Sequence, residues 1–400
     1  MKKLAVLVMV LLLVCAGCGQ GELQGIMPEE EQTAVDQVEV IRMDVQGEVS
    51  FAVPFPGGYL AQSYDQQDEM AAISLLDSEG QALWTYEVKG YSEGVIPVGD
   101  DLILLKGMRR EYTALDGGGN ELWRRQVGDD FSAPEVFLPD RAGGVFAFGS
   151  GMGDSYAHCL LWRISAAGEV RGPEPYTEIP GLSVSRGWAG ERNDYWLDGS
   201  IGNRSFLARL DSDLRPLARF DLKKNQYPQV AFFSKTNQVL LYGQAYRGSG
   251  HDGDWFEYGL LYEIDYDCNL IHSATFEGQM PNSVARLKDG RWMISFYTRD
   301  YDTPDPVYLY SADWKQKTEL NTGYGFVGGI TALDDGGYAI VGALRHPPSV
   351  SSFIPKVDLI YSRYNAAGEL LCTKTFYAKD SKSGYGVYVL VDSLGRVLID

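Results

Sequence analysis

The chain has 400 residues, of which 45% are hydrophobic and 12% aromatic, and it contains 46 glycines. This composition provides apolar material for a large core and glycine for many turns, which excludes a disordered chain and a collagen-like polymer. The formal net charge of −19 at pH 7 argues against nucleic acid as a partner, because the summed negative field repels a polyanion.

The first residues carry the pattern of a secretory signal. Lys2 and Lys3 precede an unbroken apolar run of eleven residues from Leu4 to Val14. A run of this length is too short to cross a hydrocarbon core, which needs roughly 20 residues. Residues 1–17 are therefore predicted to be a signal peptide that is removed.

A cysteine follows the signal pattern directly. The small residues Ala16 and Gly17 before Cys18 resemble the lipobox of bacterial lipoproteins, in which the cysteine is lipidated and becomes the new N-terminus. Cys15 departs from that motif, which usually has leucine at this place. We expect lipidation at Cys18 and a cell-membrane, extracytoplasmic location, and ordinary secretion with cleavage nearby is the alternative.

Residues 18–36 are polar and acidic and show no hydrophobic period. Such a segment is typical of a flexible tether between an anchor and a folded domain. No other long apolar run follows it, so the folded body is assigned to residues 37–400 and membrane contact is expected through the lipid alone.

Two kinds of turn recur through the body, and the first kind joins a strand to a glycine-led apolar strand. Glycine, aspartate and asparagine tolerate the positive φ that tight hairpins demand. The clearest copies lie at Gly57, Gly99, Gly143, Gly290, Gly336 and Gly395, with weaker copies near Asp194 and Asn237.

The second kind of turn follows a strand of alternating or wholly apolar character. Its copies lie at Asp77, Asp116, Gly168, Asp211, Asp265, Asp313 and Gly368. The two kinds alternate without exception, with a spacing near 45 residues, which is typical of propeller blades. The fold is therefore predicted to be all-β, a single β-propeller of four-stranded blades, because each blade has two apolar faces that only its neighbours can bury.

The blade count depends on how the two ends of the chain are used. The C-terminal segment VYVLVDSLGRVLID supplies an inner hairpin without an outer one. The N-terminal segment VEVIRMDVQGEVSF carries an Asp-x-x-Gly turn at Asp44 to Gly47, and we expect it to supply the missing outer strands and close the ring. Eight blades are favoured, and seven blades with a single closing strand is the alternative, because Gly47 and Gly57 are only ten residues apart.

The segments LLDSEGQALWTYEV and TALDGGGNELWRRQV resemble the repeat of PQQ-like β-propellers, a class that shares the blade design of WD40 and YVTN-type repeats. The full motif with tryptophan occurs at Trp84 and Trp123 only. The resemblance implies either a quinone-dependent dehydrogenase or a non-enzymatic lipoprotein, since that family includes both. The tryptophan itself is structural and implies no activity.

We expect a partner to bind at the loop face, which we define as the side formed by the second-to-third loops and the blade-to-blade connections. The hairpin turns on the opposite side are short and repetitive, whereas the second-to-third loops are long and varied. The strongest candidate is the loop at residues 243–259, rich in residue types common at binding hot spots. Its candidate partner-binding residues are Tyr246, Arg247, His251, Asp252, Asp254, Trp255 and Tyr258.

Two functions are compatible with these patterns. The favoured one is a membrane-anchored scaffold that binds a protein, peptide or glycan through the loop face, and a monomer is expected. The alternative is an extracytoplasmic enzyme, either a quinone-dependent oxidoreductase or a sugar-active hydrolase or lyase, with its site at the central channel. No catalytic set, cofactor or metal site is predicted, because the four histidines are dispersed without metal-ligand spacing.

Overall fold

The computed structural model describes residues 38–399, except 66–67, 91, 130–131, 153–156, 234–237, 248–254, 298–303, 321, 323–324, 345–357 and 378–388. The predicted signal peptide, the tether and Cys18 lie outside the described residues. Strands form nearly all of the regular structure, and η1 (Met108–Arg110) is a single 3-10 turn. Within the described ranges, the model has no helix with the length and apolar character needed to span a membrane.

Backbone contacts divide the chain into two compact units. The first comprises the described part of Met1–Pro54 together with Glu79–Gln81 and Pro281–Asp400, and the second comprises Phe55–Ser78 and Ala82–Met280.

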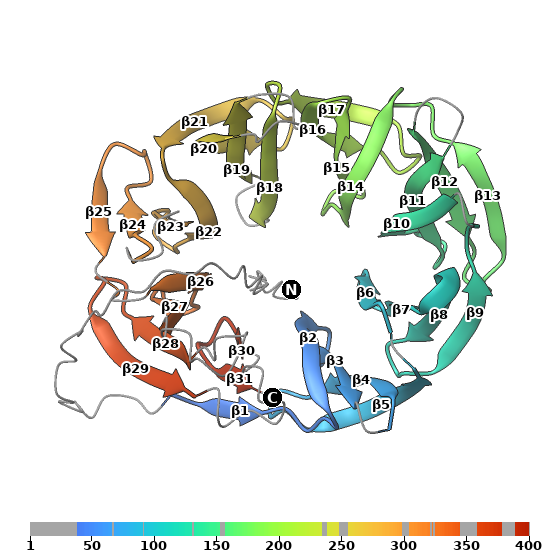
Figure 1. The fold of residues 1–400 in the computed structure, drawn as a ribbon, viewed down its shortest axis with the longest axis horizontal. Coiled ribbons are helices and arrows are strands. Elements are labelled where there is room, and N and C mark those ends of the chain that lie inside the picture. The colour runs from blue at the N-terminus through green and yellow to red at the C-terminus, as the bar shows by residue number, and fades with distance from the viewer. Residues whose placement is uncertain are drawn as a thin grey trace. The chain divides into compact units, whose positions relative to one another are not determined.

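The second unit contains four complete sheets, each with its strands in sequence order and antiparallel neighbours (Figure 1). These sheets are β6 (Gly94–Val98), β7 (Leu102–Lys106), β8 (Glu111–Asp116) and β9 (Glu121–Gln126); β10 (Ser132–Pro139), β11 (Val145–Met152), β12 (Ala157–Ile164) and β13 (Val170–Pro175); β14 (Leu182–Ala189), β15 (Tyr195–Ile201), β16 (Arg204–Leu210) and β17 (Pro216–Asp221); and β18 (Gln226–Phe233), β19 (Gln238–Arg247), β20 (Trp255–Asp265) and β21 (Leu270–Glu277).

The other sheets repeat this four-strand order. They are β2 (Glu48–Phe55), β3 (Gly58–Asp65), β4 (Met70–Leu76) and β5 (Ala82–Lys89); β22 (Met280–Arg286), β23 (Trp292–Tyr297), β24 (Val307–Tyr310) and β25 (Lys317–Leu320); and β26 (Phe326–Ala332), β27 (Tyr338–Leu344), β28 (Asp358–Tyr364) and β29 (Leu370–Phe376). With a further sheet built from both chain ends, the described residues form eight sheets, which confirms the all-β propeller and the favoured count of eight.

The eighth sheet combines strands from the two ends of the chain, as predicted for closure. Its order is β1 (Val40–Arg42), β31 (Val397–Ile399) and β30 (Val389–Val391), and β1 runs parallel to β31 (Figure 1). The role predicted for the turn at Asp44 to Gly47 is wrong, because this turn connects β1 to β2 in the next sheet and forms no hairpin within the eighth. The segment between Gly47 and Gly57 holds β2 alone, and β2 pairs with β3, so no second outer strand follows the turn.

Both predicted kinds of turn are confirmed as hairpins. The glycine-centred turns join the first and second strands, and positive φ values of 95° at Gly57 and 82° at Gly143 explain their glycines. The aspartate turns join the third and fourth strands. At Asp116, the carboxylate Oδ1 accepts hydrogen bonds from the backbone N–H groups of Gly118 and Asn120, at 2.9 and 2.8 Å, which locks the turn.

Tryptophan connects successive sheets of the second unit. The indole Nε1 of Trp84 donates to the carbonyl oxygen of Gly117 at 3.0 Å, and its ring covers Gly119, where a Cβ would lie 2.5 Å from a ring carbon. Trp123 covers Gly168 of the following sheet in the same way. The Asp-Gly-Trp repeat thus has a packing reason: the tryptophan of one sheet needs a residue without a side chain in the outer turn of the next.

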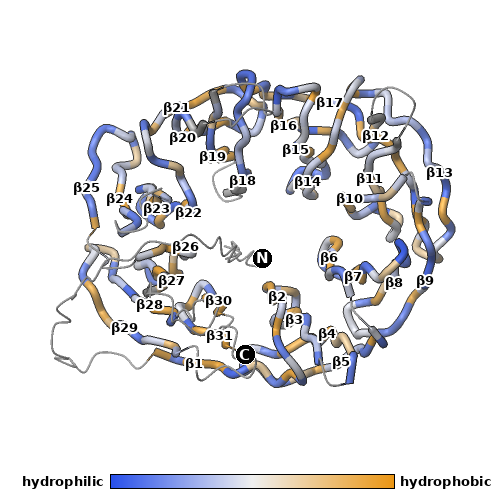
Figure 2. Tube along the Cα trace, in the orientation of Figure 1, coloured by the Kyte–Doolittle hydropathy of each residue, from blue (hydrophilic) through white to orange (hydrophobic). Residues whose placement is uncertain are grey.

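Hydrophobic side chains concentrate on the middle strands and on the faces between sheets. The outer strands β9, β13 and β25 are mainly hydrophilic (Figure 2). Trp162 and Trp292 are fully buried, and Phe376 is buried in a cluster with strands of the eighth sheet. Stacking of neighbouring sheets therefore buries the apolar surface that a lone sheet would expose.

Candidate functional site

The predicted 243–259 segment spans the end of β19 and the start of β20. Arg247 and Trp255 are paired across these two strands, and Tyr246 and Tyr258 lie beside them. His251, Asp252 and Asp254 lie outside the described residues. Of the predicted site residues, Tyr246 and Tyr258 are the two whose side-chain contacts the structure describes.

Backbone hydrogen bonds bring two connections and one strand end of the second unit together. The N–H of Asn225, in the connection from β17 to β18, donates to the carbonyl oxygen of Asn203 in the β15–β16 turn at 3.2 Å. The N–H of Tyr246 donates to the carbonyl oxygen of Asn225 at 3.1 Å. A second-to-third turn, a sheet-to-sheet connection and the end of β19 therefore share one side of these sheets, as expected of the loop face.

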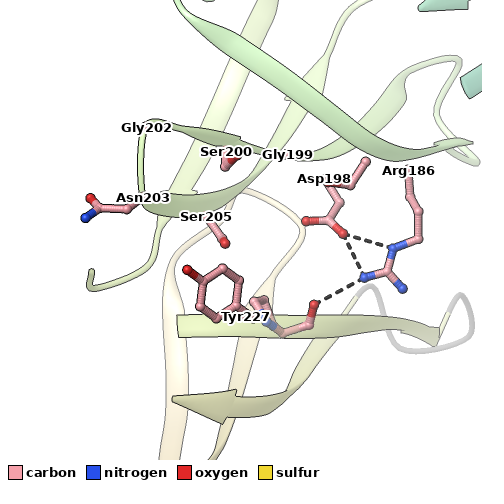
Figure 3. Close-up of a pocket in the computed structure, with 10 residues that line it drawn as sticks. Arg186, Asp198, Gly199, Ser200, Gly202, Asn203, Ser205 and Tyr227 are labelled. Carbon is pink, nitrogen blue, oxygen red and sulfur yellow. Dashed lines mark hydrogen bonds and ion pairs between the residues drawn. The ribbon is translucent and has the colours of Figure 1, made fainter. Parts of the chain in front are cut away.

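A pocket of about 220 Å³ opens at this place, between the β14–β17 sheet and β18 (Figure 3). Arg186 and Ser185 of β14 line one wall, and Asp198 to Ser200 of β15 line another. The turn residues Gly202 and Asn203, Ser205 of β16, and Tyr227 and Pro228 of β18 complete the lining. Most of the lining side chains carry hydroxyl, amide, guanidinium or carboxylate groups, and Tyr227 and Pro228 add apolar surface.

An ion pair with one buried partner shapes the pocket wall. The guanidinium of Arg186 donates to Asp198 Oδ2 through Nε at 3.0 Å and through Nη2 at 2.9 Å, and Nη2 also donates to the carbonyl oxygen of Pro228 at 3.2 Å (Figure 3). The Asp198 side chain is 7% exposed, whereas that of Arg186 is 43% exposed. Burial raises the pKa of Asp198 above its usual value, and Arg186 opposes that rise. The arginine thus fixes β14 against β18 while part of its surface faces the pocket.

Tyrosine rings border the pocket on the β18 side. Tyr227 is 47% exposed and lies on the side where Figure 3 shows Asn203 and Ser205. The ring of Tyr227 meets that of Tyr246 at 5.8 Å between centroids and an angle of 66°, an edge-to-face contact. The pocket therefore lies directly beside the segment selected from the sequence.

A buried glutamine holds the neighbouring tyrosine in place. The amide nitrogen of Gln226 donates to the hydroxyl of Tyr258 at 3.2 Å, and its amide oxygen accepts from the hydroxyl of Tyr262 at 3.0 Å. Gln226 is 1% exposed, so these bonds fix the start of β18 from within the protein. The predicted residue Tyr258 is thus part of the support of the site.

Close packing explains the glycine between the two sides of the pocket. A Cβ on Gly199 would lie 2.5 Å from the carbonyl oxygen of Ser183, so β14 and β15 approach too closely there for any other residue. Arg186 and Asp198 are direct partners across the same two strands, which places their side chains within bonding distance.

The site offers hydrogen bonding and shows no catalytic constellation among its lining residues. No histidine, cysteine or lysine lines the pocket, so its serines have no adjacent base of those types. In the ranges that the structure covers, no group of three His, Cys, Asp or Glu side chains is arranged to hold a metal ion. The lining side chains offer hydrogen-bond donors and acceptors.

The buried thiols offer no reactive group. Cys159 and Cys268 are free and buried, and burial raises the pKa of each to about 12. A thiol with such a pKa is not ionised at neutral pH and is a poor nucleophile.

Arg186, Asp198 and Tyr227 were not selected from the sequence. A usable signal was present in the segment YWLDGSI, where Asp198 interrupts an apolar strand, because a charge within a buried strand requires a partner. Its partner, Arg186, lies on a neighbouring strand, and Tyr227 lies on the next sheet. The three residues come together only in the folded protein, so no local sequence pattern relates them.

Comparisons with known proteins find similar structures but no related sequence. Neither the protein-family models nor the curated proteins include a match to this chain. The structure of BamB from Moraxella catarrhalis is similar, with 12% identity over 87% of this chain and 95% of that chain and a TM-score of 0.46. The C-terminal WD40 domain of Sif2 has 10% identity over 91% of this chain and 95% of that chain, with a TM-score of 0.48.

Virginiamycin B lyase from Staphylococcus aureus is also similar, with 12% identity over 76% of this chain and 93% of that chain and a TM-score of 0.38. At these identities the similar structures convey no activity. The strand order of the eight sheets, rather than these similarities, identifies the chain as a β-propeller.

Proposed function

We propose that the chain is a lipid-anchored extracytoplasmic protein whose β-propeller body binds a protein, peptide or glycan through the loop face. The signal pattern of residues 1–17, the cysteine at position 18 and the acidic segment 18–36 support the anchor and the tether. The contacts of Trp84 and Trp123 with the outer-turn glycines support placing the chain among the PQQ-like repeats. Within that class we propose a non-enzymatic role.

The observation that carries this proposal is the pocket beside the 243–259 segment. It combines a fixed arginine, an exposed tyrosine ring and several hydroxyl and amide groups on the side where the loops converge. Most of these residues lie on strands, which hold them rigidly, and the turn at Gly202 and Asn203 places the pocket on the loop face. The lining residues contain no nucleophile paired with a histidine or lysine base, which favours binding over catalysis.

The test is capture of a partner by the full chain on intact cells. We expect Trp255→Ala to lose the partner after mild crosslinking, because it removes a large aromatic residue from the predicted binding segment 243–259. Its thermal unfolding should stay near that of the parent. The control is Leu217→Ala, which truncates a side chain that is 52% exposed on the outer strand β17 and should capture normally. Equal capture by both variants would contradict the proposed role.

A further inference from the structure

We propose that the pocket between the β14–β17 sheet and β18 binds one unit of a neutral saccharide, an inference that rests on the proposed binding function and narrows its ligand. Four properties of the pocket point to this class: its size, its lining, its charge and the ring at its edge.

The size fits a single small polar group. Pockets for drug-sized ligands span about 300–1,000 Å³, and the volume of about 220 Å³ lies below that range. A single sugar ring at the end or along the side of a chain is of this order of size. A folded protein domain would meet the surrounding surface and not the pocket itself.

The lining matches a ligand covered with hydroxyl groups. Ser185, Ser200 and Ser205 carry hydroxyls that both donate and accept, and the amide of Asn203 does the same. Apart from Tyr227 and Pro228, the lining residues are of the types Ser, Asn, Asp, Arg and Gly, so few side chains are suited to pack against an aliphatic peptide side chain. A polyol can exchange its bonds to water for bonds to these groups.

The charge of the pocket favours an uncharged ligand. Asp198 neutralises the guanidinium of Arg186 through contacts of 2.9 and 3.0 Å, so the arginine does not present an unpaired positive charge. The chain as a whole carries a formal charge of −19, which repels phosphate-rich or uronate-rich polymers. The guanidinium and the carboxylate still offer a donor and an acceptor side by side.

The exposed tyrosine supplies a surface for the ring of a sugar. Tyr227 is 47% exposed, and its edge-to-face contact with Tyr246 at 5.8 Å holds the ring in one orientation. The face of an aromatic ring is negative, and the C–H groups on the apolar side of a sugar carry partial positive charge. Stacking there would leave the sugar hydroxyls turned toward Asn203 and the serines.

The experiment is calorimetric titration of the purified full chain with maltotriose, cellotriose and chitotriose. A hexuronate trimer and an acidic peptide provide the charged comparisons. We expect at least one neutral trisaccharide to bind, with affinity at least tenfold lower in Tyr227→Ala. Affinity should be preserved in Tyr227→Phe, which keeps the ring, and in Tyr377→Ala, which truncates a tyrosine of equal exposure outside the pocket. Thermal unfolding of each variant checks that the fold is intact.

Three results would overturn the inference: no binding of any neutral trisaccharide, binding of the charged ligands alone, or unchanged affinity in a folded Tyr227→Ala protein. If Trp255-dependent capture of a protein partner persists in any of these cases, the saccharide inference fails and the proposed binding function stands. If capture also shows no dependence on the loop face, both fail.

Discussion

The buried carboxylate of Asp198 fixes the position of Arg186 in the wall of the pocket. The carboxylate is almost fully enclosed, while its arginine partner is only half-buried and reaches across to a carbonyl oxygen of the next sheet. A buried carboxylate without a cation carries the full cost of desolvation. The pair therefore links the stability of two sheets to the shape of the pocket.

Removing the arginine gives a prediction with a defined pH dependence. In Arg186→Met, the pKa of Asp198 should rise further, because burial remains and the opposing cation is lost. We expect a loss of about 1–2 kcal/mol in unfolding free energy at pH 7.5, a modest figure because the arginine is half-exposed. The folded variant would hold a proton that the unfolded chain releases, so its stability should fall as pH rises above about 4.

Urea unfolding at pH 4.5 and pH 7.5 provides the measurement. The loss should be smaller at the lower pH, where Asp198 is closer to its neutral form. With Asp198→Asn added to Arg186→Met, the loss of unfolding free energy should be the same at the two pH values, since the titrating group is gone. A loss of the same size at both pH values would show that the arginine acts through packing alone.

At the scale of residues, the sequence revealed part of the site. Tyr246 and Tyr258 could be predicted because residue type and loop position are properties of one local segment. In the structure, Tyr246 contacts Tyr227 of the pocket, and Tyr258 is bonded to Gln226 next to it in sequence. Arg186 and Tyr227 could not be selected, because their importance depends on contacts made across strands and sheets. Whether the predicted residues bind a partner stays a prediction.

At the scale of elements, the hairpins were the most predictable part of the fold. Their turns depend on residues a few positions apart, such as the carboxylate of Asp116 and the N–H groups that follow it. The pairing of β1 with β31 was predicted only as a shared sheet, without its parallel direction. No turn joins these two strands, so no local signal in the sequence specifies how they align.

The contact between tryptophan and glycine makes a second prediction. Gly119→Ala would place a methyl group 2.5 Å from the Trp84 ring at a residue whose φ is +80°, so it combines a clash with backbone strain. We expect a loss of about 1–3 kcal/mol in unfolding free energy by urea denaturation. Gly117→Ala in the same turn has nothing within 4 Å of the added atom and should change stability by no more than about 0.5 kcal/mol. Equal effects of the two substitutions would argue against docking of the tryptophan on the turn.

At the scale of the whole molecule, repetition explains why eight sheets could be counted from the sequence. Each sheet has apolar faces that need a neighbour, and both ends of the chain enter one sheet, so the strands at the termini are paired. The segment before this body is where the proposed anchor lies.

The proposed lipid anchor requires the thiol of Cys18. Cys18→Ser should abolish incorporation of radiolabelled palmitate and release the protein from the cell, because the lipid has no other attachment point in the proposed design. Cys15→Ser, three residues earlier, should still be labelled and retained. Labelling that survives in Cys18→Ser would place the modification elsewhere or show that the chain is simply secreted.

Binding at the loop face can be tested by photo-crosslinking from two positions. A photo-crosslinking amino acid is placed either at position 246, beside the pocket, or at position 213, in the hairpin turn between β16 and β17 on the opposite side. Both versions of the full chain would be irradiated on intact cells and the adducts counted by mass spectrometry. We expect a discrete adduct from position 246 and none from position 213. Adducts from position 213 alone, or equal adducts from both, would contradict binding at the loop face.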